Sequence, residues 1–238
     1  MKIIIGYLYG DLMNIYGDTG NIIALQRRAL WRGIEVEVQK ISVGIKLKRG
    51  DVDIFFFGGG QDQAQEIVAN DLKSKAAVIK AEVERGVPLL SICGGYQLLG
   101  GYYKPFKEPK LPGVGLFPVY TVASHDRMIG NIVIDSGFGK LVGFENHSGK
   151  TYLKSGSQPL GRVIKGFGNN GDDHKEGCIY KNAIGCYMHG SLLPKNPQLA
   201  DWLLQKALEV KYGKEIELIP LDDSLESQAH IAAIQKFS

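Results

Sequence analysis

One cysteine stands where the local sequence favours nucleophilic chemistry. The apolar run at residues 87–92 is typical of a buried strand, and Cys93, Gly94 and Gly95 follow it before a short helical pattern. A nucleophile elbow needs small residues two positions before and after the nucleophile, and Ser91 and Gly95 meet that need. A helix that begins at the sulfur favours the thiolate and offers free N–H groups to a developing oxyanion. The pattern therefore favours a nucleophile at Cys93 over a packed core thiol.

A cysteine nucleophile needs a base, and the chain has five histidines. His189 follows the apolar run at residues 184–188 and precedes Gly190, so it stands at the end of a predicted strand. It is the first choice for the base. His147 lies in the polar stretch FENHSG, which we expect to be a loop, and it is the alternative base.

A second glycine-rich turn, Gly58-Gly59-Gly60, follows the apolar run at residues 52–57. The turn lacks the Gly-Lys-Ser/Thr ending of a P-loop, so nucleotide binding by this chain is not supported. Its backbone amides can approach a ligand closely and would complete an oxyanion hole beside Cys93. Arg127, just before a predicted strand, has the fork that suits a substrate carboxylate, although an arginine alone is more often a surface residue.

Strand and helix patterns alternate over the first hundred residues. Apolar or alternating runs predict strands at residues 3–9, 34–41, 52–57 and 87–92, and helical spacing predicts helices at 21–31 and 63–85. Units of this kind form parallel sheets through right-handed crossovers, and ligands bind at the carboxyl ends of their strands. We therefore expect an α/β fold in which the Gly58–Gly60 turn and Cys93 face one crevice.

The pattern changes after residue 113. Short runs at residues 114–122, 129–134, 162–164, 179–180 and 184–188 predict antiparallel strands added to the sheet, with Gly-rich turns between them. Helices are predicted at 196–212 and 224–235. No internal repeat or clear linker divides the chain, so we expect a single domain over residues 1–213 and a C-terminal extension with a short helix over 214–238.

Composition excludes several classes of protein. Lys and Arg number 28 against 25 Asp and Glu, and their even spread gives no basic patch for nucleic acid. No apolar run approaches the length of a membrane span, so no direct membrane span is expected. The three cysteines form no C-x-x-C pair, which argues against a metal site and a disulfide framework and suits a reducing, cytoplasmic location.

These motifs together resemble a known family. SICGGYQ around Cys93 and YMHG around His189 resemble the class I, or triad, glutamine amidotransferases, and GFENHSGKT at residues 143–151 resembles their cobyric acid synthase-like branch. The stretches LMNIYGDTGN (12–21), GGGQD (58–62) and HGSLLPKNP (189–197) are similar to the small GatD-type amidotransferase subunits of lipid II isoglutaminyl synthases. The resemblance covers about residues 3–205 and implies a three-layer, flavodoxin-like α/β fold.

The resemblance also implies roles for particular residues. Cys93 would attack the side-chain amide of L-glutamine and His189 would transfer protons, which makes the chain a glutaminase. Backbone N–H groups of Gly59, Gly60 and Gly94 would hold the oxyanion. Residues that would contact the substrate complete the implied site: Arg127 at the α-carboxylate, with Gln97, Tyr96, His147 and Asn146. One departure stands out, because triad enzymes carry His-x-Glu and Ser191 occupies the glutamate position here. The group that orients His189 stays open between Asp18, Glu145 and another carboxylate.

A partner follows from the same resemblance. Ammonia would pass to a Mur ligase-like, MurT-type synthetase subunit that uses ATP and Mg to amidate D-glutamate of the lipid II stem peptide to D-isoglutamine, near the inner membrane face. This chain would need no cofactor of its own. The alternatives are a cobyric acid synthase-like amidotransferase in cofactor biosynthesis, a free cysteine hydrolase or peptidase, and a catalytically silent binding subunit.

Overall fold

The structure is a computed structural model that describes residues 1–15, 17–107 and 109–237. Its first sheet is mostly parallel, in the order β11-β12-β4-β3-β1-β2, and only β11 runs antiparallel to its neighbour. The strands are β1 (Lys2–Leu8), β2 (Glu35–Ile41), β3 (Ile54–Phe57), β4 (Leu89–Ile92), β11 (Cys178–Tyr180) and β12 (Ala183–Cys186). All residues of β3, β4 and β12 are buried, as expected for strands covered on both faces.

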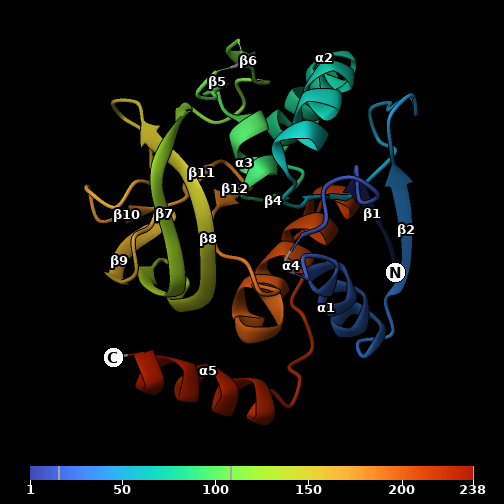
Figure 1. The fold of residues 1–238 in the computed structure, drawn as a ribbon. Coiled ribbons are helices and arrows are strands. Elements are labelled where there is room, and N and C mark those ends of the chain that lie inside the picture. Colours follow the sequence, from blue (N-terminus) through green and yellow to red (C-terminus); the bar gives the residue numbers. More distant parts are fainter. Residues whose placement is uncertain (16, 108, 238) are drawn as a thin grey trace.

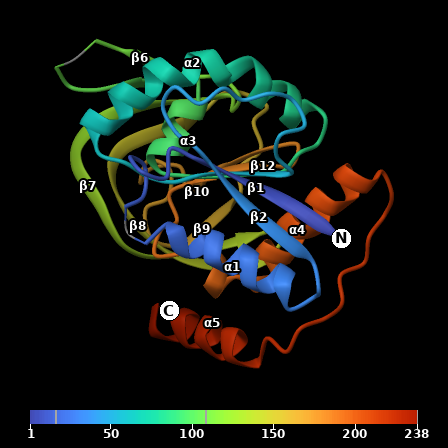
Figure 2. The same ribbon diagram turned by 90° about the vertical axis from the view of Figure 1, so that its right-hand side faces the viewer.

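Helices cover both faces of this sheet. Figure 1 and Figure 2 show α2 and α3 above it and α1 and α4 below it, with α5 lying lowest. The helices are α1 (Thr19–Leu30), α2 (Asp62–Glu84), α3 (Gly94–Leu99), α4 (Pro197–Tyr212) and α5 (Ser224–Phe237), with the 3-10 helix η1 at Leu193–Lys195. The predicted α/β fold with a parallel sheet is therefore confirmed. None of the described helices is long and apolar enough to cross a bilayer.

A second sheet packs beside the first. It runs in the order β10-β9-β7-β5-β6, with β8 paired to β7. Its strands are β5 (Tyr102–Lys104), β6 (Leu111–Pro112), β7 (Val119–Ser136), β8 (Gly139–Leu153), β9 (Gly161–Lys165) and β10 (Lys175–Glu176). The prediction that these strands add to the first sheet as antiparallel strands holds only for β11, since β12 joins that sheet parallel to β4. It was wrong for the others, because the long β7–β8 hairpin carries the chain into a sheet of its own (Figure 1).

The strand β8 also corrects the expected loop around His147. Its residues alternate between buried and partly exposed from Phe144 to Thr151, which is the period of a strand with one covered face. The buried positions hold Glu145, His147 and Gly149 instead of large apolar residues. A strand whose inward side chains are polar has no alternating hydrophobic pattern, so the sequence did not indicate it.

The C-terminal segment is anchored by buried charge. Arg28 of α1, 3% exposed, donates to both oxygens of Asp201 on α4 and to both oxygens of Asp223 just before α5. Along α5, His230 Nδ1 lies 2.7 Å from the carbonyl oxygen of Lys195 in η1. These contacts hold α5 against the segment that follows His189.

Candidate active site

Cys93 has the backbone of a nucleophile elbow. It lies between β4 and α3 with φ 49° and ψ −108°, a conformation that is strained for a residue with a side chain. Its N–H donates to Cys186 O on the neighbouring strand, and the residue is 6% exposed. The turn is tight, because a Cβ on Gly95 would lie 2.7 Å from Phe57 O. The structure therefore confirms the turn predicted from the small residues around Cys93.

Two backbone N–H groups beside the elbow have no hydrogen-bond partner among the described residues. A Cβ on Gly94 would lie 3.1 Å from the nitrogen of Gly60, so the two glycines meet at the start of α3. The N–H of Gly94 opens a helix and has no intrahelical acceptor. No hydrogen bond joins the Gly60 N–H to any described residue. These two groups fit the predicted oxyanion hole.

The predicted oxyanion role of Gly59 needs correction. Its N–H donates to Asp18 Oδ2 at 2.7 Å, and both groups are buried. A donor that is already bonded to a carboxylate is not available to an oxyanion. Gly59 instead supplies space, because a Cβ there would lie 2.9 Å from His189 Cε1 and 3.3 Å from Cys93 Cβ.

His189 is the base that the structure brings to Cys93. It follows β12, is fully buried, and is held to Phe144 by two backbone hydrogen bonds of 2.7 and 3.1 Å. Burial lowers the pKa of His189, but the negative charge of the Cys93 thiolate and hydrogen bonds with Asp18 and Cys93 outweigh burial and raise it to about 10. His189 is therefore favoured as the imidazolium beside Cys93.

Asp18 orients the base. Its Oδ1 lies 3.3 Å from His189 Nδ1, and its carboxylate is fully buried at the start of α1, where it makes no side-chain helix cap. Glu145 is ruled out for this role, because its two oxygens accept from the N–H groups of Phe167 at 2.7 Å and Gly168 at 2.9 Å. Among the three options that the sequence left open, the structure selects Asp18.

Ser191, which replaces the usual glutamate, supports this arrangement. Its hydroxyl donates to Gly17 O at 2.6 Å and so ties the segment after His189 to the loop that carries Asp18. The loop also bonds to the glycine turn, since the Ile15 N–H donates to Gly59 O at 3.3 Å. The carboxylate reaches His189 from an element far away in sequence, and no local spacing could have identified it.

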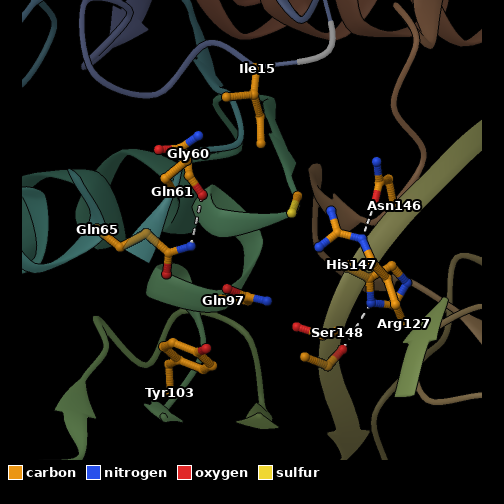
Figure 3. Close-up of a pocket in the computed structure, with 12 residues that line it drawn as sticks. Ile15, Gly60, Gln61, Gln65, Gln97, Tyr103, Arg127, Asn146, His147 and Ser148 are labelled. Carbon is orange, nitrogen blue, oxygen red and sulfur yellow. Dashed lines mark hydrogen bonds between the residues drawn. The ribbon is translucent and has the colours of Figure 1, made fainter. Parts of the chain in front are cut away.

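The opposite wall of the site comes from the second sheet. The pairing of β7 with β8 shifts register between Ala123 and Met128, and the residues in the shift include Arg127. Arg127 Nε donates to Asn146 Oδ1 at 2.7 Å, and both side chains line a cavity of about 270 Å³ that also reaches Cys93 (Figure 3). A register shift of this kind re-aims side chains next to functional sites. The structure thus brings the predicted Arg127 and Asn146 to the nucleophile.

Gln97 and His147 also line this cavity. Gln97 Nε2 donates to Tyr187 OH at 3.0 Å, and His147 Nδ1 lies 2.9 Å from Gly149 O. The His147 ring stacks on Tyr187 with centroids 3.6 Å apart and an interplanar angle of 7°. The hydrogen bond of His147 is therefore within its own strand. His147 forms part of the pocket wall and is not placed as the alternative base.

Tyr96 does not reach the cavity, which corrects its predicted contact with substrate. It is fully buried, and its ring packs edge-on against Phe117 and Tyr187 at centroid distances of 5.6 Å. The Tyr96 ring lies against β12, where a Cβ on Gly185 would lie 2.1 Å from it. Gln97 is therefore the residue of α3 that joins Cys93 at the cavity.

Sequence reasoning missed Gln65 in the first turns of α2. Gln65 lines the cavity and is 3% exposed. The sequence did offer one signal. Gln65 follows the Gly58–Gly60 turn by about one helical turn, and a helical side chain points back toward the N-terminus, over the residues that precede the helix.

A parallel sheet with a cysteine elbow, an N–H pair and a buried His–Asp pair is the arrangement expected of a cysteine-nucleophile enzyme. The family model for the CobB/CobQ-like glutamine amidotransferase domain matches residues 4–197, and the chain belongs to this family.

More specific relatives follow. The chain is 43% identical over 236 residues to the GatD subunit of glutamine-hydrolysing lipid II isoglutaminyl synthase from Staphylococcus aureus, covering 99% of this chain and 96% of that protein. The GatD subunit from Streptococcus pneumoniae is 42% identical, over 94% of this chain and 87% of its own length. A cobyric acid synthase from Pelotomaculum thermopropionicum is 27% identical over 59% of this chain and 30% of that protein.

Solved structures agree on the fold. PurLQS from Thermotoga maritima superposes with a TM-score of 0.60 at 17% identity, over 90% of this chain and 100% of that one. A glutamine amidotransferase from the same organism gives a TM-score of 0.55 at 16% identity, over 98% and 91% of the two chains.

Proposed function

We propose that this chain is the glutaminase subunit of a lipid II isoglutaminyl synthase. The observation that carries the proposal is the identity of 43% with a GatD subunit over nearly the whole of both chains, in a molecule whose Cys93, His189 and Asp18 are assembled for acyl transfer. The cobyric acid synthase reading is weaker, because the chain spans less than a third of that relative's length.

The chemistry follows from the geometry. The Cys93 thiolate attacks the side-chain amide carbon of glutamine, and the oxyanion is held by the N–H groups of Gly60 and Gly94. His189, as imidazolium, donates a proton to the departing ammonia and leaves a thioester on Cys93. Neutral His189 then takes a proton from water, and hydroxide attacks the thioester to release glutamate and restore the thiolate. Asp18 holds the imidazole in place through both steps.

Recognition comes from the second sheet. Arg127 presents a guanidinium whose Nε is held by Asn146, and the planar fork of a guanidinium suits the α-carboxylate of glutamine. The α-carboxylate end of the substrate therefore lies on the β7–β8 side of the cavity while the carboxamide lies at Cys93.

The ammonia is passed to a partner. The relatives are named as subunits, so we infer a heterodimer with a Mur ligase-like synthetase that supplies ATP, Mg and the D-glutamate acceptor of lipid II, on the cytoplasmic side of the membrane. ATP and its metal belong to that partner in this proposal.

The test is ammonia release from glutamine by the purified chain, with and without the synthetase subunit, for wild type and Cys93→Ala. We expect release that requires Cys93 and increases with the partner, together with amidation of lipid II. Turnover of other amides without a partner would favour a free hydrolase. An inert Cys93 in both states would favour a silent binding subunit and would overturn the proposal.

A further inference from the structure

Gln65 has an unusual environment in the cavity wall. It lies near the start of α2, and its side chain points toward the same space as Cys93 and Gln97 (Figure 3). With 3% of its surface exposed, it is one of the few buried polar residues of α2. Neither the family model nor the names of the relatives assign it a role.

The orientation of the Gln65 amide is unambiguous. Its Nε2 donates to Gly60 O at 3.1 Å. A backbone carbonyl can only accept, so the nitrogen of the amide must face Gly60 and the oxygen must face away from it. Gln65 Oε1 is buried and has no hydrogen-bond partner among the described residues. A buried carbonyl oxygen without a donor is costly, and native proteins seldom leave one unpaired without a functional reason.

Gln97, on the next helix, also donates its amide N–H to a protein oxygen. Its Nε2 donates to Tyr187 OH, which also bonds Thr151 Oγ1 at 2.6 Å. No described residue donates to Gln97 Oε1. Two neighbouring amides therefore use their N–H groups on protein acceptors and keep their carbonyl oxygens for another donor.

We propose that Gln65 is a substrate-recognition residue whose Oε1 accepts an N–H from the α-ammonium group of glutamine, with Gln97 Oε1 as its companion. This inference rests on glutamine being the substrate. An ammonium group has three donors and no acceptor, so it needs a wall of acceptors. Arg127 on the facing wall takes the α-carboxylate, and the ammonium on the same carbon is then directed to the wall of Gln65 and Gln97.

The experiment compares glutamine with 4-carbamoylbutanoate, which is glutamine without its α-amino group. Affinities of both compounds are measured by calorimetry on the Cys93→Ala chain, alone and combined with Gln65→Met or Gln65→Glu. Gln205→Met, on α4 outside the cavity, is the matched control, and thermal melts verify folding of each variant.

We expect the Cys93→Ala chain to prefer glutamine over the analogue by about tenfold or more, as for a hydrogen bond to a charged group. Gln65→Met should reduce this preference to within about threefold by weakening glutamine binding, with the affinity for the analogue nearly unchanged. Gln65→Glu keeps an acceptor oxygen and should retain the preference, as should Gln205→Met.

Other outcomes overturn the inference. If Gln65→Met weakens both compounds equally, the residue acts only through Gly60 and does not read the ammonium. Suppose the wild-type chain hydrolyses glutamine, but the Cys93→Ala chain with Gln65→Met still binds glutamine more tightly than the analogue by the original factor. The inference then fails while the proposed function stands. Failure of the chain to bind or hydrolyse glutamine, even with its partner, would overturn both.

Discussion

The two sheets build the two walls of the site in different ways. The first sheet supplies chemistry from turns at the ends of β3, β4 and β12, where backbone positions place Gly60, Cys93 and His189. The second sheet supplies recognition from the middle of two long paired strands, where Arg127 and Asn146 meet across a register shift. In the proposed function, local turn geometry thus places the reacting groups, and long-range strand pairing places the groups that would bind the substrate.

This comparison predicts separable defects. Changes on the first wall should lower kcat more than they raise KM, because the reacting groups act mainly in the transition state. Changes on the second wall should raise KM more strongly. A variant of either wall that shows the opposite pattern would break the comparison.

The largest effect is expected from Asp18→Asn. Asparagine keeps the shape and an acceptor for the Gly59 N–H but loses the charge that orients and stabilises the His189 imidazolium, so kcat should fall about a hundredfold. Steady-state ammonia release measures this, and Asp11→Asn, an exposed neighbour in the same loop, is the control. A kcat within about threefold of wild type would show that Asp18 does not position the base.

The same variant should move the pH profile. Asp18 contributes to raising the pKa of His189 to about 10, so wild type keeps its imidazolium until the pH approaches that value. Removal of the negative charge lowers this pKa, and the alkaline limb of kcat/KM should therefore move to lower pH. An unchanged alkaline limb would show that the charge of Asp18 does not raise the pKa of His189.

The second effect is on recognition. Arg127→Met should raise KM for glutamine about tenfold to a hundredfold through the lost carboxylate contact, with a smaller change in kcat. Asn146→Ala should produce a weaker version of the same defect, because it frees the Arg127 side chain without removing its charge. Arg162→Met, an exposed arginine of β9, is the control. If Arg127→Met lowers kcat by as large a factor as it raises KM, Arg127 would belong among the reacting groups.

The smallest effect on activity is expected at a carboxyl group that joins the two regions and acts on stability. Glu176 of β10 accepts from the Tyr187 N–H at 2.5 Å, two residues before His189, and burial raises its pKa to about 8. The folded state thus binds a proton that the unfolded state releases near its ordinary pKa of about 4.3, so stability should fall as pH rises between these values. Glu176→Gln should remove this loss.

Denaturant unfolding at pH 5 and pH 9 tests the role of Glu176. We expect the free energy of unfolding of wild type to fall by roughly 4 kcal/mol more than that of Glu176→Gln between the two values, since ionising a buried carboxyl destabilises the native state. Parallel pH dependence in the two proteins would show that Glu176 is not protonated in the fold. Glu217→Gln, an exposed residue after α4, is the matched control.

Several predictions from the sequence depended on signals that lie close together in the chain. The elbow at Cys93 and the Gly58–Gly60 turn were recognisable because small residues, a strand end and a helix start lie within a few positions. Arg127 could be named from the sequence as an arginine fork before a predicted strand, but its role at the substrate and that of Asn146 came from the resemblance. The substrate contact of Tyr96 was implied by the resemblance, and the six-residue helix that carries it is too short for apolar periodicity to show that its ring is buried.

The sequence by itself determined the alternation that makes the parallel sheet, the tight turn that carries Cys93, and the strand end that carries His189, because each depends on contacts between near neighbours. Only the tertiary structure decided which carboxylate orients the base, which glycine N–H groups stay free, and that β7 and β8 form a separate sheet. Asp18 meets His189 across 171 positions, and Gly59 loses its N–H to the same carboxylate. Such pairings depend on how distant elements pack, and no short stretch of sequence contains them.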